Sequence, residues 1–367
     1  MTQNARRSAL ASLAALLVLT GILSAGVAHA ESAAELPAAN GTVVLPAQEW
    51  PLKPGPRTIK VYVFYPGGQL KNVKPSTGLM LSIHNWGGHG ADGTASPTAL
   101  AERLDVVAIA VDYLQSGDSG SNDIPEPYEH GYLQALDALR ALEFVFDGLK
   151  ARQIPFAAGR IFATGGSGGG NVTLMVNKLA PRTFTCIIDM CGMSRLTDAT
   201  AFHLPGAGLN ARYSRDPKSP AFLSADDQQI RFVGNPEHLK TMKQLQNTCK
   251  VIVVHGSEDP VVSPADAREM VENMKHEGFD VEPHFITTAD LDGKVFTTPG
   301  HGLGNRTAIV FQVAGKYLQS DSPQALVRKT PTDFECRDTK VRYETTHGRF
   351  VISYEAGYPV GRFEAKR

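Results

Sequence analysis

The run Ile161-Phe162-Ala163-Thr164-Gly165-Gly166-Ser167-Gly168-Gly169-Gly170-Asn171-Val172-Thr173-Leu174-Met175 holds a serine between two groups of glycines. The residues before the glycines are typical of a strand, and those after them are typical of a helix. The pattern G-x-S-x-G around Ser167 suits such a junction, because the chain must turn sharply there. A side chain two positions before or after the serine would clash with neighbouring backbone. The run therefore predicts a nucleophilic serine, exposed at a helix N-terminus. A glycine-rich turn or an anion-binding loop is the alternative interpretation.

Strand and helix patterns alternate on both sides of this run. The predicted strands cover residues 58–65, 79–83, 106–111, 160–164, 186–190, 251–254 and 282–287, and the predicted helices cover residues 97–104, 132–146, 168 to about 179, 264–276 and 308–318. Most of the strands are short and almost continuously apolar, which is typical of a mostly parallel sheet covered by helices on both faces. We therefore expect an α/β fold in three layers, with its chemistry beyond the carboxyl ends of the strands.

Two segments interrupt this alternation. Residues from about 194 to 248 are too long for a simple crossover and rich in polar residues, and we expect them to form a polar cap on the active-site side. Residues 321–367 follow the last predicted helix, and the alternating segments 341–345 and 349–354 predict a β-hairpin there. The expected organisation is a main domain over residues 31–320, with the cap inserted, and a C-terminal β extension over 321–367.

The first thirty residues have the pattern of a signal peptide. Arg6 and Arg7 form a basic start, Ala9 to Val27 is apolar, and Ala28-His29-Ala30 fits a cleavage site. An uncleaved membrane anchor is the alternative, and the two arginines also raise twin-arginine export, although their flanking residues fit that signal poorly. No later stretch is apolar enough to span a bilayer. We therefore expect an exported protein, periplasmic or secreted, without a membrane contact after cleavage.

Charge and cysteine content narrow the possible partners and cofactors. The formal net charge is -1, so no overall electrostatic attraction to nucleic acid or anionic membranes is expected. Four cysteines are present, and none forms a C-x-x-C pair or a zinc-binding pattern; they are Cys186, Cys191, Cys249 and Cys336. We expect no bridge between Cys186 and Cys191, because opposite ends of one strand lie too far apart. A Cys186–Cys249 bridge is left open, and Cys191 is expected as a free thiol near the catalytic face.

A serine nucleophile needs a histidine base, and the base needs a carboxylate to orient it. In sheets of this kind the chain order is serine, then acid, then histidine. Asp259 lies at the tip of a turn after the strand that ends in Val254-His255-Gly256, and His301 lies between glycines after the last predicted strand. We therefore assign Asp259 as the acid and His301 as the base. Other carboxylates could take the place of the acid, namely Glu258, Asp189 and Asp198.

The oxyanion of an acyl-transfer reaction needs two backbone N–H groups. One is expected from Gly168, directly after the serine. The second is expected from the glycine-rich loop Ser82 to Gly90, with Trp86 as the first candidate and Asn85 as the second. His84 and His89 in this loop are interpreted as packing residues, because a metal pair there has no third ligand at a diagnostic spacing.

With these motifs, the chain resembles the α/β-hydrolase superfamily from about Thr58 to Leu318. The elbow Gly165-Gly166-Ser167-Gly168-Gly169 and the acid turn Gly256-Ser257-Glu258-Asp259 look most like the dienelactone-hydrolase and prolyl-oligopeptidase branch. Gly300-His301-Gly302 matches the base, and His84-Asn85-Trp86-Gly87-Gly88 matches the oxyanion loop except that Asn85 replaces a common glycine. The resemblance implies an exported serine hydrolase without a cofactor. The sequence lacks the large N-terminal propeller of some related peptidases, which favours an esterase.

The expected function is hydrolysis of a carboxylic ester from a small molecule or a polymer. A serine peptidase or amidase using the same residues is the first alternative, and a non-catalytic binding protein on the same fold is the second. The loop 114–123 and the cap are both polar, and we expect them to border a site for short-chain or polar esters. The sequence leaves the oligomeric state open.

Overall fold

The computed structural model describes residues 34–117 and 126–366. The predicted signal peptide, residues 1–30, and most of the predicted rim loop, residues 118–123, lie outside the described residues. Within the described part, no helix is long and apolar enough to cross a membrane.

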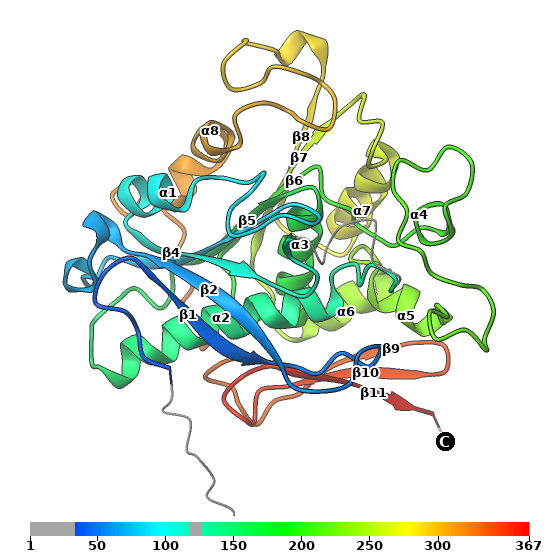
Figure 1. Cartoon of the computed structure of the whole chain (residues 1–367). Helices are drawn as coiled ribbons and strands as arrows, with labels where there is room; N and C mark the ends of the chain where they lie inside the picture. The colour runs from blue at the N-terminus through cyan, green and yellow to red at the C-terminus, as the bar shows by residue number, and fades with distance from the viewer. Residues whose placement is uncertain (1–33, 118–125, 367) are drawn as a thin grey trace, which may run out of the picture. The chain divides into compact units, whose positions relative to one another are not determined.

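An eight-stranded sheet runs through the centre of the described part (Figure 1). Its strands stand in the order β1-β2-β4-β3-β5-β6-β7-β8; β1 and β2 are antiparallel to their neighbours, and the strands from β4 to β8 are parallel. In chain order they are β1 (Gly41–Ala47), β2 (Arg57–Phe64), β3 (Gly78–Ile83), β4 (Val106–Asp112), β5 (Ile161–Gly166), β6 (Cys186–Met190), β7 (Lys250–Gly256) and β8 (Val281–Ile286). The predicted mostly parallel sheet is confirmed. Strand β1 was not predicted.

Helices cover both faces of this sheet, as the apolar strands predicted. One face carries α1 (Pro97–Leu104) and α8 (Arg306–Leu318), whose apolar residues share a buried cluster with Met80 and Ile188. The other face carries α2 (Tyr132–Ala151), α3 (Gly168–Leu179) and α7 (Pro264–His276), which bury the larger cluster around Leu81 and Val253. Figure 1 shows α1 and α8 on the opposite side of the sheet from α2. The three-layer α/β fold class is confirmed.

The insertion at 194–248 does not form a single cap. It contains the short helices α4 (Asp198–Phe202), α5 (Ala225–Ile230) and α6 (Pro236–Gln244). Of the insertion, only residues in its first part, as far as Gly208, line the cavity beside Asp259. From Ile230 to Met242 the chain buries apolar side chains in the main core, because every third or fourth residue of α6 is apolar and needs a covered face. The expectation that the whole insertion lies on the active-site side is therefore wrong for its second part.

The C-terminal extension is a three-stranded antiparallel sheet rather than a hairpin alone. The predicted pair is β9 (Val341–Glu344) and β10 (Gly348–Ser353), and an unpredicted third strand, β11 (Val360–Ala365), pairs with β10. Tyr343 and Tyr354 are fully buried and donate hydrogen bonds to the backbone carbonyls of Lys178 and Leu179 in α3. The extension therefore packs into the same core as the main sheet.

All four cysteines are free thiols in the structure. Cys186 and Cys191 lie at opposite ends of β6, as the strand assignment required, and Cys186 and Cys249 form no bridge. Cys191 follows β6 directly and receives a hydrogen bond from the Gly256 N–H at the end of β7, with 3.5 Å between the nitrogen and Sγ. The thiol therefore lies at the carboxyl ends of the strands, where it was expected.

Candidate active site

Ser167 stands between β5 and α3 in the sharp turn that the glycines predicted. Its backbone has φ 56° and ψ -119°, a conformation that residues with a side chain rarely adopt. A Cβ at Gly165 would overlap the carbonyl oxygen of Gly169, and a Cβ at Gly169 would overlap that of Ile83. Ser167 is 8% exposed rather than freely exposed, because the His301 ring and the Trp86 loop lie against it.

The structure brings Ser167, His301 and Asp259 together. The hydroxyl of Ser167 lies 2.8 Å from Nε2 of His301, and Nδ1 of His301 lies 2.8 Å from Oδ2 of Asp259. These residues come from three separate loops, at the carboxyl ends of β5, β7 and β8. In this arrangement a proton on Nδ1 is donated to Asp259, which leaves Nε2 unprotonated and able to accept the hydroxyl proton.

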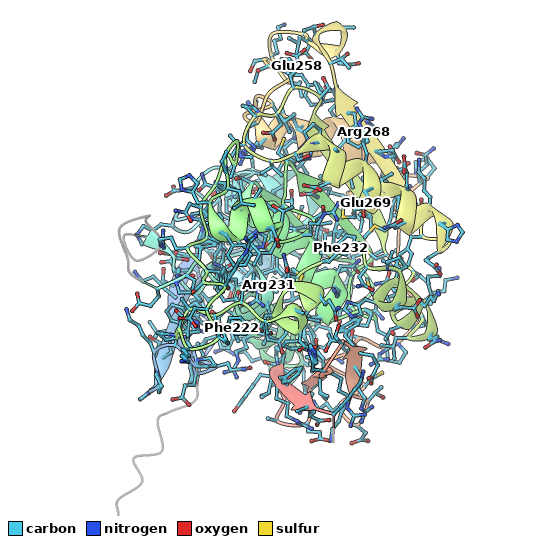
Figure 2. All side chains as sticks on the ribbon, turned by 90° about the vertical axis from the view of Figure 1, so that its right-hand side faces the viewer. Phe222, Arg231, Phe232, Glu258, Arg268 and Glu269 are labelled. Carbon is cyan, nitrogen blue, oxygen red and sulfur yellow. The ribbon has the colours of Figure 1, made fainter. Side chains whose placement is uncertain are left out.

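The other carboxylates considered from the sequence lie elsewhere. Glu258 is exposed, on the loop that leads from β7 to α7 (Figure 2). Asp198 pairs with Arg215 and Gln228 on the surface of the insertion. Asp189 is buried in β6 and accepts a hydrogen bond from the Gly192 N–H. Of these carboxylates, Asp259 alone contacts His301 within the described residues.

The Asp259 carboxylate is held in its charged form by several donors. Oδ1 accepts hydrogen bonds from the N–H groups of Val261 and Val262 at 2.8 and 2.9 Å. Burial opposes the charge, but the contacts with His255, His301 and the Val262 N–H outweigh it and lower the pKa of Asp259 below its ordinary value. The carboxylate therefore stays ionised and fixed in orientation, as a group that orients a histidine requires.

Gly168 and Trp86, the two expected donors to an oxyanion, lie close to each other beside the Ser167 turn. Gly168 starts α3, so its N–H has no partner within the helix. A Cβ on Gly168 would lie 2.6 Å from the Trp86 nitrogen, which shows how closely the two residues approach. The Trp86 N–H makes no hydrogen bond with another described residue, whereas the Asn85 N–H donates to the Asp92 carbonyl. The geometry thus favours Trp86 over Asn85 as the second donor.

His255 is a neighbour of the site that sequence reasoning missed. It was assigned no role from the sequence; it lies near the end of β7 and is fully buried. Its Nε2 lies 3.1 Å from the Val262 carbonyl oxygen and 3.4 Å from Oδ2 of Asp259. One feature of the sequence could have indicated that His255 lies near Asp259. His255 precedes Asp259 by four residues, at the end of an apolar strand.

Aromatic side chains pack against one another beside the loop that carries Trp86. Trp86 stacks on Tyr128 with 3.6 Å between the ring centroids and meets the edge of His130. Tyr128 joins apolar residues of the insertion in a small buried cluster, which includes Leu196, Ala201, Ala211 and Leu223. His84 stacks on Tyr113 instead, in agreement with its interpretation as a packing residue.

The buried His130, which contacts Trp86, is expected to make the free energy of unfolding depend on pH. Burial lowers the pKa of His130 to about 3, against about 6.5 in an unfolded chain. Between these values the unfolded state binds more protons, so the contribution of His130 to stability is complete above about pH 6.5 and is lost as the pH falls.

We therefore predict that His130→Gln loses less stability than the wild type between pH 7 and pH 5, because an amide does not titrate. The midpoint of urea unfolding, measured at both pH values, tests this. His276→Gln, at the exposed end of α7, is the control and keeps the wild-type difference. An unchanged difference in His130→Gln would contradict the burial argument.

Solved structures with a similar fold include peptidases. The acylaminoacyl peptidase of Pyrococcus horikoshii matches with a TM-score of 0.51 and 12% identity, over 77% of this chain and 42% of its own. An acylaminoacyl peptidase in complex with Z-Gly-Gly-Phe-chloromethyl ketone matches with a TM-score of 0.50 and 13% identity, over 80% of this chain and 43% of its own. The chain thus spans less than half the length of these proteins.

Sequence comparison adds one partial match. Residues 207–349 match the model of a family described as a protein of unknown function (DUF2920). No curated protein sequence matches the chain. The strand order, the serine turn and the structural matches together show that the chain has the fold of the α/β-hydrolase superfamily.

Proposed function

We propose that this protein is a serine hydrolase that cleaves carboxylic esters. The observation that carries the proposal is the continuous hydrogen-bonded series from Ser167 through His301 to Asp259, with 2.8 Å at each contact. Neither histidine nitrogen is left for another partner, and the serine occupies a strained turn at a helix N-terminus. Strained backbone of this kind is concentrated at functional sites.

The geometry supports a two-step acyl transfer. Ser167 Oγ attacks the ester carbonyl while His301 Nε2 takes its proton. The carbonyl oxygen becomes an oxyanion held by the N–H groups of Trp86 and Gly168. His301 then gives the proton to the departing alcohol. Water attacks the acyl-enzyme with His301 again as base, and the acid leaves as Ser167 recovers its proton.

A serine peptidase or amidase is the second candidate, because the same groups perform both reactions. The specific observation that favours it is the structural match to acylaminoacyl peptidases. A matched pair of substrates that differ only in an ester or an amide bond separates the two candidates. Under our proposal the ester is hydrolysed and the amide is at most a poor substrate. Preferred cleavage of the amide, after correction for the intrinsic reactivity of the two bonds, would assign the protein to the peptidases.

We further predict a preference for short acyl chains. A lipase lid hides a broad apolar surface, but the buried apolar residues of the insertion belong either to the cluster with Tyr128 or to the main core. Phe222 is the only large apolar residue of the insertion that is exposed, and Figure 2 shows it on a face that also carries the charged residues Arg268 and Glu269. Esters with acyl chains of about two to four carbons should therefore give the highest kcat/KM.

A panel of 4-nitrophenyl esters of increasing acyl length measures this preference. The matching control is an emulsified long-chain triglyceride, with the rate recorded below and above the concentration at which droplets form. Highest activity on the emulsion, with activation at the oil–water interface, would contradict the prediction.

We also propose that the protein acts outside the cytoplasm, in the periplasm or as a secreted enzyme, from the signal-peptide pattern of residues 1–30. Cleavage after Ala30 is checked by mass spectrometry of the protein recovered from its own cell. A protein found in the cytoplasm with its first thirty residues attached would refute this localisation.

A further inference from the structure

A second group of reactive side chains lies directly behind the acid of the proposed triad. Cys191, His255 and Asp259 are all buried, and one possible ligand atom from each lies within 4.8 Å of the other two. Cys191 follows β6 and His255 ends the apolar part of β7, its neighbour in the sheet. Asp259 belongs to the acid turn and His255 precedes it by four residues, but no sequence motif links either of them to Cys191, which the parallel pairing of β6 and β7 brings beside them.

We propose that Cys191, His255 and Asp259 form a binding site for a thiophilic divalent cation such as Zn²⁺, and that a bound cation takes the Asp259 carboxylate away from His301. The site would make the proposed hydrolase sensitive to metal. It goes beyond the proposed function, and only its effect on turnover rests on that function.

The donor set and its geometry fit this class of cation. One thiolate, one imidazole and one carboxylate are the ligands that Zn²⁺ takes in proteins, with bonds of about 2.0–2.3 Å that place ligand atoms roughly 3.3–3.8 Å apart. His255 Nε2 and Asp259 Oδ2 are already 3.4 Å apart. Because the three atoms lie within 4.8 Å of one another, the Cys191 thiol needs to move by up to about 1.5 Å to bind the same cation. Water can fill the fourth position.

Charge balance favours the buried complex. The Cys191 thiol releases its proton to solvent on binding, so a thiolate and a carboxylate together neutralise a divalent cation, and no electron is transferred. The Gly256 N–H already points at the Cys191 sulfur at 3.5 Å and can stabilise the thiolate. The N–H groups of Val261 and Val262 keep the other oxygen of Asp259 in place.

A second carboxylate, Asp189, lies on the neighbouring strand β6. Nδ1 of His255 and Oδ2 of Asp189 are both buried and make no hydrogen bond with a described residue. Asp189 pairs with Val253 across β6 and β7, two residues before His255, so both side chains lie on the same face of the sheet. A histidine that binds a metal through Nε2 carries its proton on Nδ1, and a carboxylate usually accepts that proton. The two atoms form no hydrogen bond with each other in the structure, so Asp189 takes this role only if side-chain rotation brings them into contact.

A cavity supplies a path from solvent. It has a volume of about 460 Å³ and lies between the first part of the insertion and the loop after β7. Met193, Thr197 and Gly208 line it on one side, and Asp259 and Val262 line it on the other. The cavity borders Asp259, whereas Cys191 and His255 lie behind it and do not line the cavity.

The binding test uses the full chain with Ser167→Ala, so that its result does not depend on hydrolysis. Co²⁺ serves as the probe, because a cobalt–thiolate bond absorbs in the near ultraviolet. We expect one Co²⁺ per chain with this absorption, and displacement by Zn²⁺.

Cys191→Ala and the conservative Cys191→Ser remove the absorption. Cys336→Ala, which alters the one cysteine that is not buried, keeps it. Asp189→Asn weakens Co²⁺ binding by about 10- to 100-fold. Absence of the absorption, or its persistence in both Cys191 variants, would overturn the site.

The second arm measures ester turnover with Zn²⁺. Saturating Zn²⁺ should lower the wild-type rate to about the level of metal-free Asp259→Asn, and it should not lower the rate of Asp259→Asn further. Each variant is compared with its own metal-free rate. Equal inhibition of both proteins would show that Zn²⁺ acts elsewhere and would refute the link to Asp259. If the wild type hydrolyses no ester, the proposed function fails, and the Co²⁺ titration still decides whether the metal site exists.

Discussion

Replacing Ser167 by alanine should lower kcat on an activated ester by roughly 10⁴-fold or more, with the fold intact. The physical reason is that the variant lacks the hydroxyl, 2.8 Å from His301 Nε2, that forms the acyl-enzyme in our proposal. Steady-state kinetics with a 4-nitrophenyl ester, together with circular dichroism to check folding, give the measurement. Ser320→Ala, an exposed serine after α8, is the matched control and keeps the wild-type rate.

The same mechanism predicts a non-additive double variant. His301→Ala should cause damage similar to that of Ser167→Ala, and the double variant should be little worse than either single one, because the two residues act as a unit. Near-normal turnover in Ser167→Ala, or losses that multiply in the double variant, would contradict the mechanism.

Replacing Asp259 by asparagine should lower kcat by roughly 10²- to 10⁴-fold. The amide keeps the size of the carboxylate but removes the charge that fixes the His301 proton on Nδ1, at the 2.8 Å contact. The rate on the same activated ester measures the loss.

The control for this substitution is Asp198→Asn, because Asp198 was a rival for the acid and lies on the surface of the insertion. It should have no comparable effect. If Asp198→Asn were the damaging change and Asp259→Asn were harmless, the assignment of the acid would be wrong.

The sequence predicted the parts of the molecule that local patterns determine. The strand β6 was predicted at its exact bounds, as was α7, because apolar runs and a proline at a helix start are local signals. The serine turn was likewise visible, since its glycines are required by close backbone contacts that the structure contains. The arrangement of Ser167, His301 and Asp259 could be anticipated because each follows a different strand of one sheet.

What the sequence did not reveal depends on contacts between distant segments. Strand β1 exposes Thr42, Val44 and Pro46, and because proline is untypical of a strand interior, the strand becomes recognisable only when it pairs with β2. The second part of the insertion contains many polar residues, yet its few apolar ones, such as Leu239 and Met242, bury themselves in the main core. The neighbourhood of His255 and Cys191 exists because β6 and β7 are adjacent, which no spacing along the chain encodes.

The most direct test of the hydrolase proposal is labelling of the folded protein with a fluorophosphonate, followed by mass mapping of the modified peptide. Such reagents react with a serine whose hydroxyl is activated by a neighbouring base. The account predicts one label per chain, on Ser167, with no label in Ser167→Ala and much slower labelling in His301→Ala. A folded wild-type protein that takes up no label, or that takes it up on another serine, would contradict the account.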